Sequence, residues 1–116
     1  MYKFNDREYP CRATLTMGVI GGKWKASILQ NLRGGALRYN ELRKLMPTIT
    51  ERTLSLQLKT LVKDGIVKRK VYASKPPLKV EYSLTELGKT LLPLLQAIVD
   101  WAKYVNKLNA DERSKK

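Results

Sequence analysis

The chain has 116 residues, 43% of them hydrophobic, and carries 23 Lys and Arg against 10 Asp and Glu, a formal net charge of +13. These values predict a single globular domain over residues 1–116 and exclude a disordered chain. One cysteine and no histidine exclude an internal disulfide and the usual zinc or copper ligand sets, so no metal or cofactor is expected.

The sequence also predicts where the protein works. No apolar run approaches the roughly 18 residues of a membrane span, and the N-terminus lacks the apolar segment of a signal peptide. We therefore expect a cytoplasmic protein without membrane contact, associated with the nucleoid if it binds DNA.

The first third of the chain is predicted to be an arm and two helices. Residues 1–10 form the arm, residues 12–20 a helix that two glycines interrupt, and residues 23–33 a core helix that ends at Gly34 and Gly35. The apolar face of the core helix consists of Trp24, Ile28, Leu29 and Leu32.

A short strand-like segment, ALRY, leads into a helix-turn-helix over residues 40–64. Asn40 is predicted to cap its first helix, which ends before Pro47. The inward side chains of that helix are expected to be Leu42, Leu45 and Met46.

The second helix of this pair is amphipathic, with Thr50 as its predicted N-cap and Gly65 as its stop. A 3.6-residue repeat places Leu54, Leu58, Leu61 and Val62 on the buried face. The opposite face carries Arg52, Leu56, Lys59 and Lys63, with Thr53, Ser55 and Thr60 at its margins. Such a face is either an ordinary solvated surface or a surface that binds a polyanion.

Residues 66–84 alternate with the two-residue period of strands around the turn sequence SKPPLK, which predicts a basic β-hairpin with a stiff tip. Residues 85–108 then repeat apolar residues in steps of four and three, as a coiled-coil helix does, before a tail at 109–116. Pro93 is expected to kink this helix.

The apolar stripe of the last helix is wider than one small domain needs to cover, which predicts a homodimer. Its expected interface residues are Leu91, Leu94, Leu95, Ile98, Trp101 and Val105.

The order of these elements predicts a mainly α, α+β fold: a winged helix-turn-helix with a small β-hairpin wing. Between Arg38 and Glu81, eleven basic residues stand against four acidic ones, and basic domains of this strength often bind nucleic acid. On the recognition helix, the candidate DNA contacts are Thr50, Arg52, Thr53, Ser55, Leu56, Lys59 and Lys63. On the supporting helix and the wing, they are Arg38, Asn40, Arg69, Lys75 and Lys79.

Five stretches resemble the HxlR-type winged-helix transcriptional regulators of bacteria, a MarR-like group: IGGKWKASIL, LRYNELRKLMPTIT, RTLSLQLKTLVKDGIVKR, VYASKPPLKVEYSLTELG and LLPLL with a later tryptophan. The resemblance implies a homodimer that is paired through its N- and C-terminal helices and binds an inverted-repeat promoter site. It also implies that Cys11 matches a cysteine with which many members sense oxidants or electrophiles.

The residues themselves leave two interpretations of Cys11 open. A helix N-terminus and the nearby Arg7 and Arg12 favour a reactive thiolate, whereas most free cysteines are small buried hydrophobes. No nucleophile–base pair indicates an enzyme. The alternative to a DNA-binding regulator is a winged-helix module that contacts protein or RNA without recognising an operator. The sequence does not indicate which small molecule or oxidant would act as an inducer.

Overall fold

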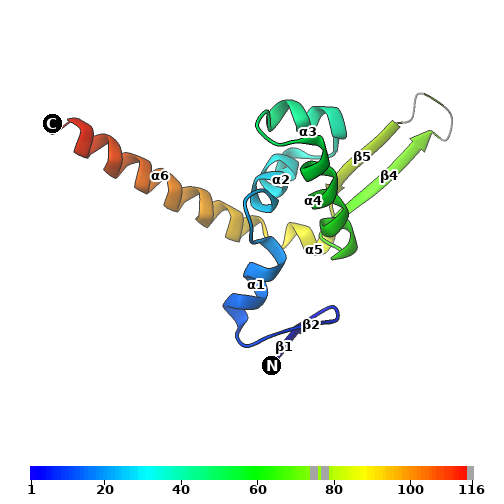
Figure 1. The fold of residues 1–116 in the computed structure, drawn as a ribbon, viewed down its shortest axis with the longest axis horizontal. Coiled ribbons are helices and arrows are strands. Elements are labelled where there is room, and N and C mark those ends of the chain that lie inside the picture. The colour runs from blue at the N-terminus through cyan, green and yellow to red at the C-terminus, as the bar shows by residue number, and fades with distance from the viewer. Residues whose placement is uncertain (74–75, 77–78, 115–116) are drawn as a thin grey trace.

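The computed structural model describes residues 1–73, 76 and 79–114. Figure 1 shows a central helical body from which α6 and the β4–β5 hairpin extend in different directions, with α1 and a small N-terminal hairpin on a third side. The elements are β1 (Tyr2–Phe4), β2 (Arg7–Tyr9), α1 (Arg12–Ile20), α2 (Lys25–Asn31), the 3₁₀ turn η1 (Leu32–Gly34), β3 (Leu37–Arg38), α3 (Tyr39–Leu45), α4 (Glu51–Lys63), β4 (Val67–Ala73), β5 (Lys79–Leu84), α5 (Glu86–Lys89) and α6 (Leu92–Ser114).

The N-terminal arm is a β-hairpin, which the sequence did not predict. β1 and β2 pair antiparallel, with Tyr2 opposite Tyr9 and Phe4 opposite Arg7. Asn5 makes the turn at a φ of 55°, a value that asparagine tolerates better than most residues. Strands of three residues are too short to show the alternation that identifies a strand in sequence.

One hydrophobic core joins α1, α2, α3, α4, the sheet and the start of α6. Leu42 and Met46 enter it as predicted, but Leu45 is 56% exposed. α3 ends at Leu45, so Met46 is no longer helical, and its backbone turns the Met46 side chain into the core while Leu45 stays outside. Trp24 is half-buried and packs against the core.

The predicted cap of α3 is wrong by two residues, since Arg38 precedes the helix and its N–H donates to Glu41 Oε1 over 2.8 Å.

The amphipathic helix α4 forms as predicted. Thr50 caps it, with its hydroxyl accepting from the Thr53 N–H over 3.1 Å. Leu54, Leu58 and Leu61 are buried. Gly65 then adopts a φ of +78°, which favours glycine, and turns the chain into β4.

The three-stranded sheet has the order β3-β5-β4, and both pairs are antiparallel. Val67 and Leu84 lie opposite each other at its base, and both are buried. ALRY therefore supplies one short strand, Leu37–Arg38, and the predicted hairpin supplies the other two. We call the β4–β5 hairpin the wing.

The predicted last helix is divided. α5 ends at Lys89 and α6 begins at Leu92, so the expected kink at Pro93 is a break before it. Pro93 lies in the first turn of α6, where its missing N–H costs no hydrogen bond. α6 continues past residue 108 to Ser114. None of the helices in the described part of the chain is both long and apolar enough to cross a membrane.

Candidate nucleic-acid interface

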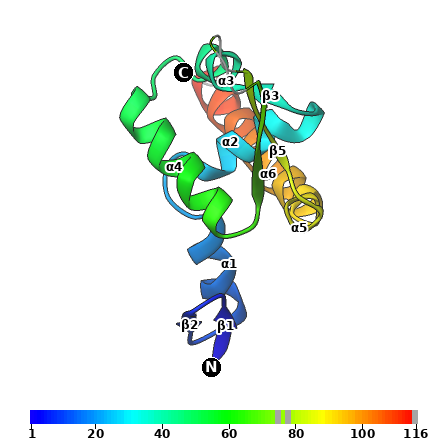
Figure 2. The ribbon, with the colours of Figure 1, turned by 90° about the vertical axis from the view of Figure 1, so that its right-hand side faces the viewer.

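The outer face of α4 projects from the body of the molecule. Figure 2 shows the helix along one flank. Of the seven predicted contact residues, Thr53 is half-buried and the other six are exposed: Thr50, Arg52, Ser55, Leu56, Lys59 and Lys63. Leu56 is 53% exposed and is the apolar residue on this otherwise polar face. Thr50 is exposed, but its hydroxyl serves as the N-cap.

α3 holds the first turn of α4 in place. Tyr39 Oη donates to the carbonyl oxygen of Glu51 over 3.1 Å, and Ser55 Oγ donates to Tyr39 Oη over 3.3 Å. The Glu51 carboxylate also accepts a hydrogen bond from Arg43 on α3. Sequence analysis missed Tyr39 and Arg43, because nothing in their spacing indicates that they meet α4. Ser55, a predicted DNA contact, is exposed, and its hydroxyl donates to Tyr39 in this structure.

The cations on α4 are free to meet a ligand. Within the described ranges, no ion pair involves Arg52, Lys59 or Lys63, although five pairs form elsewhere. Arg69 of β4 lies beside this face, since it lines a hollow of about 220 Å³ together with Ser55 and Lys59. The positive charge of α4 therefore continues onto the wing.

The wing carries an aromatic residue between two lysines. Lys70 Nζ lies 4.7 Å and Lys79 Nζ 5.2 Å from the centroid of the Tyr72 ring. Lys79 Nζ also lies 4.0 Å from Glu81 Oε1, so Glu81 partly neutralises this predicted contact residue. The alternating pattern of the hairpin could have indicated Lys70 and Tyr72, which were not singled out. Lys75 lies outside the described residues.

Arg38 and Asn40 are exposed at the start of α3. The backbone of Arg38 is bonded to Glu41, whereas no bond or ion pair of its guanidinium is found among the described residues. Asn40 thus lies in the first turn of α3, and Arg38 is the residue that caps this helix at the end of β3.

Cys11 is exposed, so the interpretation as a small buried hydrophobe is wrong. It is the N-cap of α1: its Sγ lies 3.0 Å from Thr14 Oγ1 and accepts from the Thr14 N–H over 3.4 Å. The Thr14 hydroxyl, then the N–H groups of Thr14 and Ala13, lower the pKa of the Cys11 thiol.

The two arginines expected to activate this thiol bind elsewhere. Arg7 pairs with Asp64, and the guanidinium carbon of Arg12 lies 5.3 Å from the centroid of the Tyr2 ring. The hydrogen bonds at the start of α1 therefore take the role that sequence analysis gave to Arg7 and Arg12.

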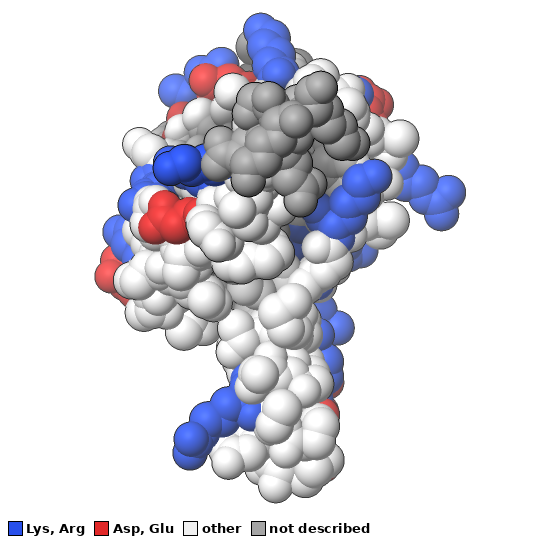
Figure 3. All heavy atoms as spheres, turned by 90° about the vertical axis from the view of Figure 1, so that its left-hand side faces the viewer, with Lys and Arg blue, Asp and Glu red and all other residues white. Residues whose placement is uncertain are grey.

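α6 presents an apolar surface beyond the core. Leu94, Ile98 and Trp101 are 36%, 39% and 69% exposed, and Val105 is half-buried. Leu95 and Leu91, which were predicted in the same stripe, pack instead on the core of this chain, where Leu95 is fully buried. Figure 3, viewed from the side toward which α6 points, shows uncharged atoms extending down over α1 and the N-terminal hairpin, with Lys and Arg mostly at the edges.

Among the described residues, no group of three or more His, Cys, Asp or Glu side chains could hold a metal ion.

Comparisons with known proteins agree with this geometry. The HxlR-like helix-turn-helix family model matches residues 19–110. An HTH-type transcriptional regulator of Bacillus subtilis, YdeP, is 48% identical over 99% of this chain and 89% of its own. Among solved structures, the redox regulator HypR matches in its reduced form with a TM-score of 0.81 and 42% identity over 87% of this chain and 99% of HypR. Its oxidised form matches with a TM-score of 0.76 and 47% identity over 81% of this chain and 96% of HypR.

Proposed function

The chain belongs to the HxlR-like helix-turn-helix family, and we propose that it acts as a homodimer that binds an inverted-repeat promoter site. Its relatives are transcriptional regulators, and no catalytic family is indicated. The protein is therefore a DNA-binding transcriptional regulator of the winged-helix type.

The exposed face of α4 is the observation that carries the proposal. Arg52 and Lys59 have no acidic partner among the described residues, and the helix that bears them is tied to α3 through Tyr39. The contacts to α3 fix the backbone from which these cations project, and an arginine can donate two hydrogen bonds to one guanine edge. In the major groove, Leu56 supplies an apolar contact suited to a thymine methyl group.

The wing has a different role in the proposal. Arg69, Lys70 and Lys79 lie on a two-stranded hairpin that extends from the body, and their charges suit phosphate oxygens. Such contacts fix the position of the protein on the duplex and carry little sequence information. We therefore assign specificity to α4 and salt-dependent affinity to the wing.

The homodimer follows from the apolar face of α6. Trp101 and Ile98 would cost free energy if they stayed in water, and a second copy of the same face would cover them. A twofold axis there would present two copies of α4, which must lie about 34–36 Å apart to enter successive major grooves.

Cys11 is the proposed control point. Its exposed thiol has a lowered pKa, and solved neighbours of this fold include a protein named a redox regulator in both oxidised and reduced forms. The thiolate can attack a disulfide of a small thiol, which forms a mixed disulfide and releases the other thiolate. The Cys11 thiolate of a second subunit can attack this mixed disulfide, which joins the two subunits and releases the remaining small thiolate; an electrophile would instead leave an adduct on the sulfur.

A competition experiment tests the function. Purified protein bound to a labelled random-sequence DNA duplex is titrated with unlabelled duplex DNA, duplex RNA and single-stranded RNA. We expect duplex DNA to compete best and sedimentation to show two chains per bound duplex. Preference for either RNA, or a monomer that binds as well as any dimer, would favour the alternative of an RNA or protein-binding module.

A further inference from the structure

Asp64 occupies an unusual position at the end of the recognition helix. It is the C-cap of α4, where the helix dipole is negative and a carboxylate is unfavourable. Its side chain is only 6% exposed, and it is the one buried charged residue among those that the structure describes. A carboxylate in such a place requires a cation, because burial of an unpaired charge is costly.

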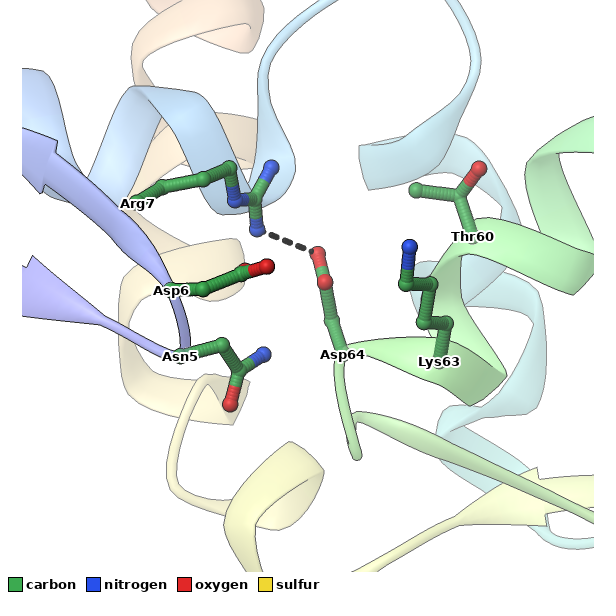
Figure 4. A pocket seen from close by; sticks show the side chains of 6 residues that line it. All are labelled: Asn5, Asp6, Arg7, Thr60, Lys63 and Asp64. Carbon is green, nitrogen blue, oxygen red and sulfur yellow. Dashed lines mark hydrogen bonds and ion pairs between the residues drawn. The ribbon is translucent and has the colours of Figure 1, made fainter.

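Arg7 supplies that cation from the other end of the sequence. Its Nη2 donates to Asp64 Oδ2 over 2.9 Å, a contact that joins β2 of the N-terminal hairpin to the end of α4 (Figure 4). The guanidinium carbon also lies 5.9 Å from the ring centroid of Phe4, the residue opposite Arg7 in the hairpin. Phe4 packs against the core, so the arginine is held from its own hairpin as well as by Asp64.

The space around this ion pair is open. Arg7 and Asp64 line a hollow of about 340 Å³, together with Asn5, Asp6, Thr60 and Lys63. Figure 4 shows the hairpin residues on one side of it and the α4 residues on the other. In this hollow, the hydrogen bond between Arg7 and Asp64 is the polar contact that crosses from one side to the other.

The N-terminal hairpin is fixed to α1 as well. Tyr9 packs so closely on Gly18 that a Cβ atom built there would lie 2.5 Å from the tyrosine ring. Cys11, the N-cap of α1, lies in the segment between Tyr9 and Gly18, the two residues that make this contact. β2, Cys11 and α1 thus form a connected unit, and Arg7 joins this unit to the recognition helix.

We propose that Arg7 is a positioning residue for DNA recognition: through Asp64 it holds the C-terminal end of α4, so that DNA affinity depends on the N-terminal hairpin and on the state of Cys11. The inference rests on the proposed function of α4 as the recognition helix. Arg7 acts through Asp64. Its role therefore differs from that of the cations of α4 and the wing, which are proposed to contact the DNA directly.

Hydrogen–deuterium exchange in the absence of DNA tests the link between the two residues. Arg7→Gln should raise the exchange of amides at residues 60–66 roughly tenfold and leave the amides of α2 unchanged, because the buried carboxylate loses its partner. Arg7→Lys should restore part of the protection. In the double variant with Asp64→Asn, the two effects should be non-additive, since each change removes the same bond.

Lys3→Gln is the matched control. Lys3 lies on the same hairpin and pairs with Glu8 over 3.6 Å at the surface, so this variant removes the same charge without touching α4. Its exchange at residues 60–66 should equal that of the wild type. Equal exchange in Arg7→Gln and Lys3→Gln would overturn the proposal, as would a rise in Arg7→Gln that extends to α2.

Binding to a duplex taken from a selection of bound sequences tests the consequence. Arg7→Gln should lower the affinity several-fold with an unchanged salt dependence, because Arg7 contacts a carboxylate and not a phosphate. Loss of about one unit of salt slope would instead make Arg7 a phosphate contact and contradict the assignment. Unchanged affinity in Arg7→Gln would remove its role in recognition. If no variant binds DNA at all, the proposed function fails, while the exchange data still decide whether Arg7 holds α4.

The dependence on Cys11 is tested with glutathione disulfide. Attack by the Cys11 thiolate forms a mixed disulfide and releases glutathione thiolate, and we expect this to raise exchange at residues 60–66 in the wild type. Cys11→Ser should not respond, and Arg7→Gln should show no further rise. An equal rise in wild type and Arg7→Gln, or no rise in the wild type, would contradict the dependence on Cys11.

Discussion

Tyr39 Oη donates a hydrogen bond of 3.1 Å to the carbonyl oxygen of Glu51, and in doing so it joins the first helix of the helix-turn-helix to the first turn of the second. The same hydroxyl accepts a bond of 3.3 Å from Ser55, one turn further along α4. The C=O groups that lack a partner within a helix are those of its last turn, and Glu51 lies in the first turn of α4. The hydrogen bond from Tyr39 is therefore an additional one and replaces no hydrogen bond within the helix. A half-buried residue of α3 therefore holds the first turn of α4, the proposed recognition helix.

Tyr39→Phe tests this relationship, because it removes the hydroxyl and keeps the ring. We expect a loss of about 1 kcal/mol in the free energy of unfolding, measured by urea denaturation, and a lower affinity for specific duplex. Tyr2→Phe is the control, since the ring of Tyr2 still meets Arg12 after the change. Equal stability of Tyr39→Phe and the wild type would show that the two hydrogen bonds do not hold α4.

Arg52→Ala and Lys79→Ala should separate specificity from affinity. Arg52→Ala is expected to cost about 1–3 kcal/mol on a specific site and little on random duplex. Lys79→Ala should weaken binding to both, and reduce the salt dependence by about one unit of slope. Anisotropy titrations at several salt concentrations measure both effects. Lys103→Ala removes the same charge from α6 and should change neither; an unchanged slope in Lys79→Ala would remove this lysine from the interface.

Lys75→Ala is expected to behave like Lys79→Ala. Its position at the tip of the hairpin sequence follows from the two prolines beside it, and the same titrations apply. If the variant with both lysines replaced keeps the salt slope of the wild type, the wing does not contact phosphate.

The thiol of Cys11 should titrate at a lower pH in the wild type than in Thr14→Val. The valine removes the hydroxyl, which is the largest cause of the lowered pKa, and keeps the Thr14 N–H. The rate of alkylation by iodoacetamide follows the thiolate fraction, so its rise with pH should shift to higher pH in Thr14→Val. Thr16→Val, in the same helix and bonded to the Arg12 carbonyl, is the control. Identical pH profiles for Thr14→Val and the wild type would contradict this cause.

The same shift fixes the sign of a small effect on stability. Folding lowers the pKa of the Cys11 thiol, so the thiolate stabilises the folded state at pH above the pKa of the unfolded chain. This contribution is lost as the pH falls through the folded-state pKa. Urea denaturation as a function of pH should therefore show a gain in stability for the wild type between the folded-state and the unfolded-state pKa of this thiol, and Cys11→Ser should lack that gain.

Ile98→Glu tests the homodimer. It places a carboxylate in the middle of the exposed apolar face of α6, next to Trp101, where a symmetry mate would bury it. Sedimentation should show a dimer for the wild type and a monomer or aggregate for the variant. Lys103→Glu lies on the opposite side of the helix by its spacing and should remain dimeric. A wild type that is monomeric at micromolar concentration would contradict the proposal.

The features of the fold that could be predicted are those that depend on the spacing of residues within a single helix or strand. The stripe of α4, the cap at Thr50 and the alternation of the wing each depend on spacing within one element, and all three are present in the structure. The division between α5 and α6 was missed because the apolar repeat runs through it without a change of phase. Pro93 marked the region but not the residue at which the helix ends.

Contacts between distant segments could not be predicted in this way. Arg7 and Asp64 are 57 positions apart, and neither is unusual in its local sequence. The N-terminal hairpin was invisible because its strands have three residues each. The role of Cys11 as a sensor stays a prediction, but the groups that lower the pKa of its thiol are those of Thr14 and not the arginines, since hydrogen-bond partners depend on how the start of α1 is capped. Leu95 was assigned to a dimer interface because a stripe on one helix cannot show which part of it the chain's own core will cover.

Selection of bound sequences from random duplex DNA with the purified protein tests the central claim most directly. Two copies of α4 related by a twofold axis predict an inverted repeat whose half-site centres are about one helical turn, roughly 10–10.5 base pairs, or a multiple of it apart. The same selection with Arg52→Ala should return a repeat with relaxed preference at the positions that Arg52 reads. Enrichment of a single unrepeated motif, or of no motif at all, would contradict recognition by a homodimer through α4.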